Sequence, residues 1–385
     1  MKKPIKILII VAVAIGVIVG VAHHFRQQAL SHMVGQMILV GFRGTTPDDA
    51  AVKDLAADIK AGKIGGIILF NVDVEQGLAA GLSMPEVRKQ IKSRNIIDVD
   101  QVKRLNEFLS DAARQGGRLP LFVSIDQEGG AIVRLVPEHG FDMVMPSAKE
   151  QSKLDMNQIN SLYAELGGRL HVLGFNVNFA PCVDVDVNPE SPAIGARGRA
   201  FSANPERVSE YGHAAADGLK KANVLSSFKH YPGHGSAGTD THDGMTDITK
   251  TWQEYELEPY ENVPAYTMVM VAHVVNGRID PDFPASLSQK TINGLLRGQL
   301  GFRGVVISDD LQMGAIYNHY GLAETLRMSI MAGTDILLLG NNLQYTENLG
   351  RIAHTEIMKM VKEGKIPRSR IQESYDRIKK MKQTI

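Results

Sequence analysis

The sequence predicts an α/β protein: a single (β/α)8 barrel of the TIM type, preceded by an N-terminal hydrophobic helix. Short apolar runs rich in β-branched residues alternate with amphipathic stretches, which is the pattern of parallel strands joined by crossover helices. Eight such runs occur, and eight strands close a barrel that needs about 250 residues or more. The 385 residues accommodate one such barrel with insertions. The expected strands are residues 37–42, 67–70, 121–125, 177–180, 224–228, 268–271, 305–307 and 336–339.

The amino terminus predicts an export element. Three lysines within the first six residues precede sixteen apolar or glycine residues, 7–22. This length lies between a signal-peptide core and a transmembrane span of about 20 residues, so cleavage after Ala22 and retention as a membrane anchor both stay open. Because the positive charges come first, the remainder is expected in the periplasm or on the outer side of the inner membrane. We therefore divide the chain into residues 1–30, the signal peptide or signal anchor, and residues 31–385, the barrel.

Composition narrows the possible partners. Lys and Arg together number 42, as do Asp and Glu, so there is no electrostatic reason to expect nucleic acid. Cys182 is the only cysteine, which excludes an intrachain disulfide and CxxC-type metal or redox motifs. We expect a monomer.

The connecting segments carry local signals of helices. Thr46-Pro47 and Asn204-Pro205 are expected to start helices, and residues 99–113 form another. Residues 71–98 are an insertion, because a connection of this length far exceeds the usual 2 to 6 residues. Within it, residues 77–82 are expected to form an apolar loop at the mouth of the barrel, where packing on the barrel is favoured over contact with substrate.

Polar residues follow several of the predicted strands. Asp126 ends the third run, Lys229 and His230 the fifth, His273 the sixth and Asp309 the seventh. Chemistry in this fold is carried by the C-terminal ends of the strands. We therefore expect these side chains to share one end of the barrel, although His273 could equally be a hydrogen-bonding core residue.

Two segments contain the candidate catalytic residues. A glycine-rich loop that starts at Lys229 leads to Asp240 and His242, so a carboxylate stands two residues from an imidazole whose tautomer it can set. A carboxylate, Asp309, stands at a strand end. A proton-transfer group facing a fixed carboxylate is what cleavage of a glycosidic bond through a covalent intermediate requires.

The same residue types leave a metal site open. Histidine and carboxylate side chains in this loop are ligands that zinc and other transition metals accept. The candidate ligands are His230, His234, Asp240, His242 and Asp243.

Four motifs, in order from about residue 35 to the C-terminus, resemble glycoside hydrolase family 3, and more narrowly its NagZ-type β-N-acetylglucosaminidases. These are Ile125-Asp126-Gln127-Glu128-Gly129-Gly130, Ile194-Gly195-Ala196-Arg197, Lys229-His230-Tyr231-Pro232-Gly233-His234-Gly235 with Asp240-Thr241-His242, and Ser308-Asp309-Asp310-Leu311-Gln312-Met313. The resemblance implies that Asp309 is the nucleophile and that His242, paired with Asp240, is the general acid/base. The residues implied to hold the sugar are Asp126, Arg134, Arg197, Lys229 and His230.

The resemblance carries further expectations for this region. The Ile-Gly-x-Arg spacing favours Arg197 over Arg199, which is expected at the surface. His234 is expected to orient the loop, and Gly233, Gly235 and Gly238 are expected to let it swing over bound sugar. No metal or other cofactor is implied.

The expected function is that of a retaining exo-β-N-acetylglucosaminidase that removes terminal β-linked N-acetylglucosamine, from a glycan or a muropeptide fragment of peptidoglycan. The few aromatic residues show no stacking series for a long glycan, which favours cleavage of a terminal sugar. Three alternatives stay open: a phosphorylase acting on the same glycosides, a metal-dependent barrel hydrolase, and a non-catalytic protein that binds the cell wall.

Overall fold

The computed structural model describes residues 26–81, 93–241 and 244–385. The predicted export segment, residues 7–22, lies outside these ranges, and so do His242 and Asp243. Within them, no helix combines the length and the apolar character needed to cross a membrane. The division of the chain into residues 1–30 and 31–385 stays a prediction.

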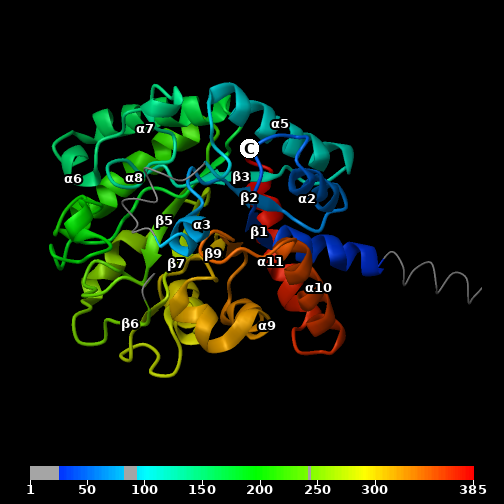
Figure 1. Ribbon diagram of the computed structural model, residues 1–385. Helices are drawn as coiled ribbons and strands as arrows, with labels where there is room; N and C mark the ends of the chain where they lie inside the picture. Colours follow the sequence, from blue (N-terminus) through cyan, green and yellow to red (C-terminus); the bar gives the residue numbers. More distant parts are fainter. Residues whose placement is uncertain (1–25, 82–92, 242–243) are drawn as a thin grey trace, which may run out of the picture.

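Eight parallel strands surround the core of the described part of the chain (Figure 1). One sheet has the order β10-β1-β2-β3-β4 and a second the order β5-β7-β9. Isolated parallel bridges, Val177 to Leu225 and Ile307 to Ile336, join the two sheets at both edges and close the ring. The predicted barrel is therefore confirmed. Its strands are β1 (Ile38–Gly41), β2 (Gly66–Ile68), β3 (Phe122–Ile125), β4 (Val177–Asn178), β5 (Ser226–Tyr231), β7 (Thr267–Val271), β9 (Val306–Ser308) and β10 (Leu337–Leu339).

Each predicted run contains or overlaps one of these strands. The largest shift is in the fifth, where the strand extends to Tyr231, so that Lys229 and His230 are residues of β5 and do not follow it. A short parallel pair, β6 (Thr246–Asp247) and β8 (Val274–Val275), lies outside the ring. All the ring strands are buried, as expected for parallel strands covered by helices.

Helices pack around the ring (Figure 1). Residues 26–36 are helical at the start of the described chain. The α-helices with described bounds are α2 (Ala50–Lys60), α3 (Val74–Ala79), α5 (Val99–Gln115), α6 (Ala148–Gln151), α7 (Met156–Val172), α8 (Pro205–Lys221), α9 (Gly314–Ala332), α10 (Leu349–Lys362) and α11 (Arg368–Lys382). Between β5 and β7 the described residues form only β6 and the 3-10 helix η3 (Glu254–Tyr260). The π-helix η5 (Lys290–Gln299) precedes β9.

Two helix starts test the capping signals. Asn204 caps α8 as predicted, because its Oδ1 accepts a hydrogen bond from the Arg207 amide at 3.0 Å. The predicted start at Thr46-Pro47 is wrong, since α2 begins at Ala50. The Asp49 carboxylate accepts from the amides of Thr45 and Thr46 at 2.7 and 3.0 Å, which holds those residues in a turn before the helix.

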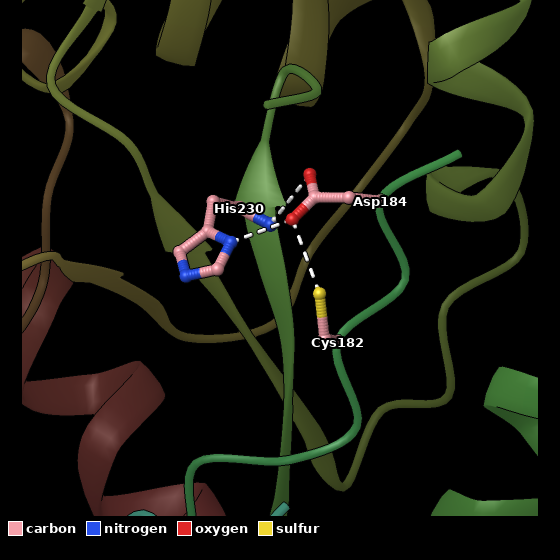
Figure 2. Close-up of side chains that lie close together, drawn as sticks. All are labelled: Cys182, Asp184 and His230. Carbon is pink, nitrogen blue, oxygen red and sulfur yellow. Dashed lines mark hydrogen bonds and ion pairs between the residues drawn. The ribbon is translucent and has the colours of Figure 1, made fainter. Parts of the chain in front are cut away.

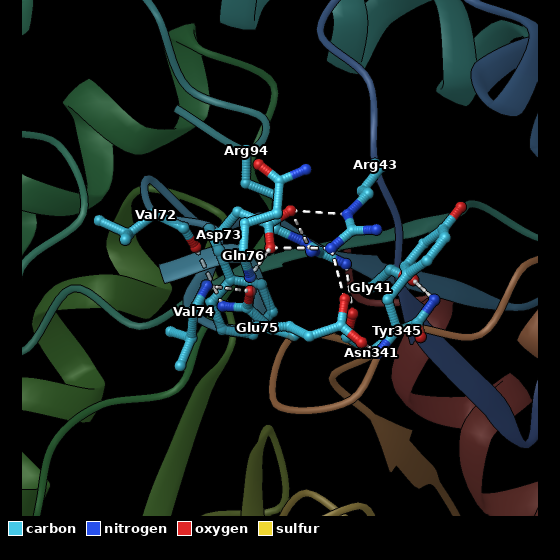
Figure 3. Close-up of polar contacts among 12 residues, drawn as sticks. Gly41, Arg43, Val72, Asp73, Val74, Glu75, Gln76, Arg94, Asn341 and Tyr345 are labelled. Carbon is cyan, nitrogen blue, oxygen red and sulfur yellow. Dashed lines mark hydrogen bonds and ion pairs between the residues drawn. The ribbon is translucent and has the colours of Figure 1, made fainter. Parts of the chain in front are cut away.

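The described ends of the 71–98 insertion are fixed to the barrel (Figure 3). Asp73 accepts from Arg43 Nε at 2.7 Å and from Arg94 Nη1 at 2.9 Å, and the Arg43 guanidinium lies 3.9 Å from the centre of the Tyr345 ring. These contacts join the insertion to the segments after β1 and β10. The predicted apolar loop at residues 77–82 is not borne out in its described part, because residues 77–79 belong to the helix α3. Packing of these residues on the barrel is not seen either, since only Gly77 is buried and Leu78 is 49% exposed.

Candidate active site

A buried group of charges lies at the C-terminal ends of β3 and β5. Lys229 Nζ is 2.9 Å from Asp126 Oδ1 and 2.6 Å from Glu128 Oε1, while Arg134 Nη2 is 3.6 Å from Asp126 Oδ2. Burial works against the charge of Lys229, but the two carboxylates outweigh it and raise the pKa of the ammonium above its usual value. The structure thus brings together Asp126, Arg134 and Lys229, as predicted, and adds Glu128.

Arg199, expected at the surface, is instead part of this group. Its guanidinium makes two hydrogen bonds to Glu128, of 2.7 and 2.9 Å, and its Nη2 lies 3.3 Å from His230 Nε2. Arg197 has a side chain 40% exposed and lies 3.5 Å from Asp240 Oδ2. Gly198, with a φ of 63°, turns the chain between the two arginines and sends Arg199 inward. The expectation for Arg199 is therefore wrong.

His230 is held by a carboxylate that the sequence reasoning missed. Its Nδ1 lies 2.6 Å from Asp184 Oδ2, and Figure 2 shows the two side chains pointing toward each other. Residues 182–184 run beside β5, because Cys182 pairs with Lys229 in a parallel bridge. Asp184 lies in the segment that leaves β4 but does not directly follow the strand, so the rule that polar residues at strand exits carry chemistry does not select it.

Cys182, Asp184 and His230 are also a possible set of metal ligands. One ligand atom from each lies within 4.8 Å of the others in the described part of the chain. Protein donors already use the carboxylate: Asp184 accepts from His230, from the His234 amide and from the Cys182 thiol. Burial raises the pKa of that thiol well above its usual value, so it remains a thiol. Hydrogen bonding accounts for this cluster without a metal.

The start of the glycine-rich loop is tightly packed. A Cβ on Gly233 would meet Glu256 Oε2 at 2.7 Å, and one on Gly235 would meet the Val185 carbonyl oxygen at 1.8 Å, whereas one on Gly238 would meet nothing within 4 Å. This packing does not support the prediction that Gly233 and Gly235 act as hinges. Gly238 is the one of the three predicted hinge residues with open space around it.

His234 lies under the same loop. Its Nε2 is 3.3 Å from Thr241 Oγ1, next to Asp240, so the predicted orienting hydrogen bond is present. Burial lowers the pKa of His234 to about 4. His234 is therefore a neutral hydrogen-bonding residue at physiological pH. His242, the predicted acid/base, lies outside the described residues.

Asp309 follows β9, at the same end of the barrel as Asp126. Its Oδ1 accepts from the Asp310 amide at 2.8 Å, and Asp310 Oδ1 accepts from the Gly340 amide at 2.8 Å. His273 is fully buried and bonds Ser286 Oγ at 2.7 Å and the Asp310 carbonyl at 2.9 Å. Asp310 and His273 thus support the strand ends, and His273 is the hydrogen-bonding core residue of the two alternatives.

A closed (β/α)8 barrel with carboxylates, cations and histidines at the C-terminal ends of its strands has these groups where enzymes of this fold carry their active sites. Residues 29–381 match the model described as Glycosyl hydrolase family 3 N terminal domain. The chain therefore belongs to glycosyl hydrolase family 3, which confirms the predicted family and its enzyme class, the glycoside hydrolases.

Two relatives indicate which members of the family the chain resembles. The chain is 35% identical over 285 residues to "Beta-hexosaminidase LpqI" of Mycobacterium tuberculosis, covering 71% of each protein. It is 29% identical to "Beta-hexosaminidase A" of Pseudoalteromonas piscicida, covering 91% of the chain but 60% of that protein.

Solved structures agree with these relatives. A family 3 β-N-acetylglucosaminidase from Paenibacillus superposes with a TM-score of 0.78 at 31% identity, over 92% of the chain and 62% of that protein. A β-N-acetylhexosaminidase from Beutenbergia cavernae superposes with a TM-score of 0.77 at 26% identity, over 92% of the chain and 98% of that protein. The chain thus spans about three fifths of the Pseudoalteromonas and Paenibacillus proteins and nearly all of the Beutenbergia one.

Proposed function

We propose that the protein is a β-N-acetylhexosaminidase that removes terminal β-linked N-acetylglucosamine and retains the configuration of the anomeric carbon. The observation that carries this proposal is the group of Asp126, Lys229, His230 and Arg199 at the strand ends of a family 3 barrel. Such a group offers fixed donors and acceptors to the hydroxyls and the acetamide of one sugar.

The reaction needs two further groups. Asp309 attacks the anomeric carbon and forms the covalent intermediate, while His242 gives its proton to the leaving oxygen and then takes one from water. Asp240 holds the His242 ring and stabilises its charged form. The position of Asp309 at the end of β9 and the ion pair of Asp240 with Arg197 support these roles. Because His242 lies outside the described residues, its role rests on the family motif.

Within the sugar site we assign Arg199 a place beside Arg134, Lys229 and His230. Arg199 is buried against Glu128, and its nitrogen reaches toward His230, whereas Arg197 points to the loop of Asp240. In this proposal Arg199 contacts the sugar, and Arg197 contacts Asp240 of the acid/base pair.

The decisive experiment traps the intermediate. A slow 5-fluoro glycoside of N-acetylglucosamine should label the wild type on Asp309, and Asp309→Asn should lose at least about 1,000-fold of the activity on a chromogenic N-acetylglucosaminide. Asp142→Asn, which changes an exposed carboxylate, is the matched control and should keep full activity. A product released with inverted configuration, or a label on another residue, would contradict the proposal.

The same assay separates the alternatives. Phosphate that diverts the product to a sugar 1-phosphate indicates a phosphorylase, loss of activity on chelation indicates a metal-dependent hydrolase, and wall binding without turnover indicates a non-catalytic protein. We also propose that the substrate is a muropeptide outside the inner membrane, because of the lysine-flanked apolar run at residues 7–22. N-terminal sequencing of the exported protein tests that location.

A further inference from the structure

Asp184 receives an unusual number of hydrogen bonds for one buried carboxylate. Its Oδ1 accepts from the backbone amides of His230 and His234, at 3.1 and 2.8 Å. Its Oδ2 accepts from His230 Nδ1 at 2.6 Å and from the Cys182 thiol at 3.2 Å. Figure 2 shows the contacts of Asp184 with His230 and Cys182, and the Asp184 side chain is fully buried. One carboxylate therefore holds the ring of His230 and also the start of the loop that leads to Asp240.

The other nitrogen of His230 decides which tautomer is present. Nε2 lies 3.3 Å from Nη2 of Arg199, and a guanidinium can only donate hydrogen bonds. Glu128 holds this guanidinium with two bonds, so it cannot turn away from the ring. Nε2 must then be the acceptor, and the ring proton must lie on Nδ1, where Asp184 receives it.

We infer that Asp184 is a positioning residue that fixes His230 as the Nδ1-protonated tautomer, with Nε2 kept as an acceptor at the sugar site. The inference rests on the proposed function in one respect: the ring of His230 and the Arg199 guanidinium, which donates to its Nε2, line the sugar site. Asp184 touches no reacting atom and acts through the imidazole.

Further contacts connect the orientation of His230 to the other charged residues of the proposed sugar site. Arg199 binds Glu128, Glu128 binds Lys229, and Lys229 binds Asp126, so the orientation of His230 is linked to every charge in the group. Burial alone would raise the pKa of Asp184, but contact with His230 and its backbone amide outweighs burial and keeps that pKa well below its usual range. Asp184 is thus a permanent acceptor at neutral pH.

Asp184→Asn isolates the contact with the ring. The amide oxygen can still accept from the two backbone amides, while the new NH2 group faces His230 Nδ1 and the Cys182 sulfur. Because NH2 can only donate, Nδ1 must become the acceptor and the ring proton must move to Nε2, toward Arg199. The backbone contacts survive and the tautomer is reversed.

Nitrogen NMR of histidine-labelled protein reads the tautomer directly, with the His230 signals assigned by their loss in His230→Gln. We expect protonated Nδ1 in the wild type and protonated Nε2 in Asp184→Asn. We also expect KM for a chromogenic N-acetylglucosaminide to rise about 10- to 100-fold, with a smaller change in kcat. In the His230→Gln background, Asp184→Asn should change KM less than about 3-fold, since the ring through which it acts is gone.

Asp335→Asn is the control. Asp335 is equally buried and lies before β10 at the opposite end of the barrel, where Arg297, Arg370 and Arg377 bind it. That variant should lower the melting temperature while the His230 tautomer and KM stay unchanged.

A proton on Nε2 of His230 in the wild type would overturn the inference. Additive effects of His230→Gln and Asp184→Asn on KM in the double variant would also overturn it. So would zinc bound stoichiometrically to the wild type and absent from Asp184→Asn, because the cluster would then be a metal site. If the wild type proves inactive on the glycoside, the proposed function fails, but the NMR result still decides the tautomer. If Asp184→Asn does not fold, the wild-type tautomer alone decides.

Discussion

At the scale of single residues, the site is a set of charges that neutralise one another away from water. Lys229 and Arg199 supply two positive charges, and Asp126 and Glu128 supply two negative ones. Burial and the neighbouring Arg199 and Lys229 act in opposite directions on Glu128, and the cations keep its pKa well below the usual range. Removing one member of such a group leaves a buried charge without its partner, which costs about 3–5 kcal/mol. Each of these residues therefore stabilises the charges of the others.

Glu256 gives a prediction about pH. Burial raises the pKa of this carboxyl, which packs against Gly233, from 4.5 to about 7. Its contribution to stability is full below pH 4.5 and is lost as the pH rises to about 7, because in this range the unfolded chain ionises Glu256 while the folded protein still holds the proton. We expect Glu256→Gln to be more stable relative to the wild type at pH 8 than at pH 5, by about 2 kcal/mol.

Urea unfolding of both proteins at pH 5 and pH 8 measures this difference. The neighbouring His234, whose pKa is lowered to about 4, adds stability as the pH rises from 4 to 6.5. It is present in both proteins, so its effect cancels in the comparison. An equal difference at the two pH values would show that Glu256 stays ionised in the folded protein.

At the scale of elements, the loop after β5 combines a rigid start with a more open continuation. Gly233 and Gly235 lie against Glu256 and Val185 with no room for a side chain, whereas Gly238 has open space. The described connection from β5 to β7 also lacks the usual α-helix and contains η3 instead. The functional loop is thus anchored at its first residues, directly beside His230.

Paired glycine substitutions test this division. Gly235→Ala should destabilise the protein by more than about 3 kcal/mol, because the new Cβ would overlap a backbone carbonyl. Gly238→Ala should change stability by less than about 0.5 kcal/mol, since nothing lies near its Cβ. Thermal unfolding of the two variants measures this difference. Similar losses of stability in both variants would contradict the conclusion that the start of the loop is anchored.

At the scale of the whole molecule, the C-terminal helix completes the end of the barrel opposite the site. Lys382 Nζ in α11 donates to Gln36 Oε1 at 2.8 Å and to the Gly65 carbonyl at 2.6 Å, next to the starts of β1 and β2. Arg370 and Arg377 of α11 bind the buried Asp335 before β10. The proposed active site and these supporting contacts thus lie at opposite ends of one ring.

Truncation tests the role of α11. A chain ending at Pro367 loses the buried Ile371, Ile378 and Met381 together with two partners of Asp335. We expect it to lose cooperative unfolding and to aggregate, because apolar surface and a buried carboxylate are exposed together. A chain lacking only Thr384 and Ile385 is the control and should unfold cooperatively. Calorimetry of the two chains measures whether each unfolds cooperatively. A cooperative transition of the chain that ends at Pro367 would contradict the prediction.

The sequence alone determined the barrel, the family and the strand-end positions of Asp126, Lys229, His230 and Asp309. Two local patterns of the sequence are enough for this. Apolar runs alternate with amphipathic stretches, and polar residues follow the apolar runs. The tertiary structure alone decided that Arg199 turns inward, that Asp184 fixes His230, and that Glu128 joins Lys229 to Arg199. These are contacts between segments far apart in the chain, and the charge, tautomer and burial of a side chain depend on neighbours that only folding brings to it.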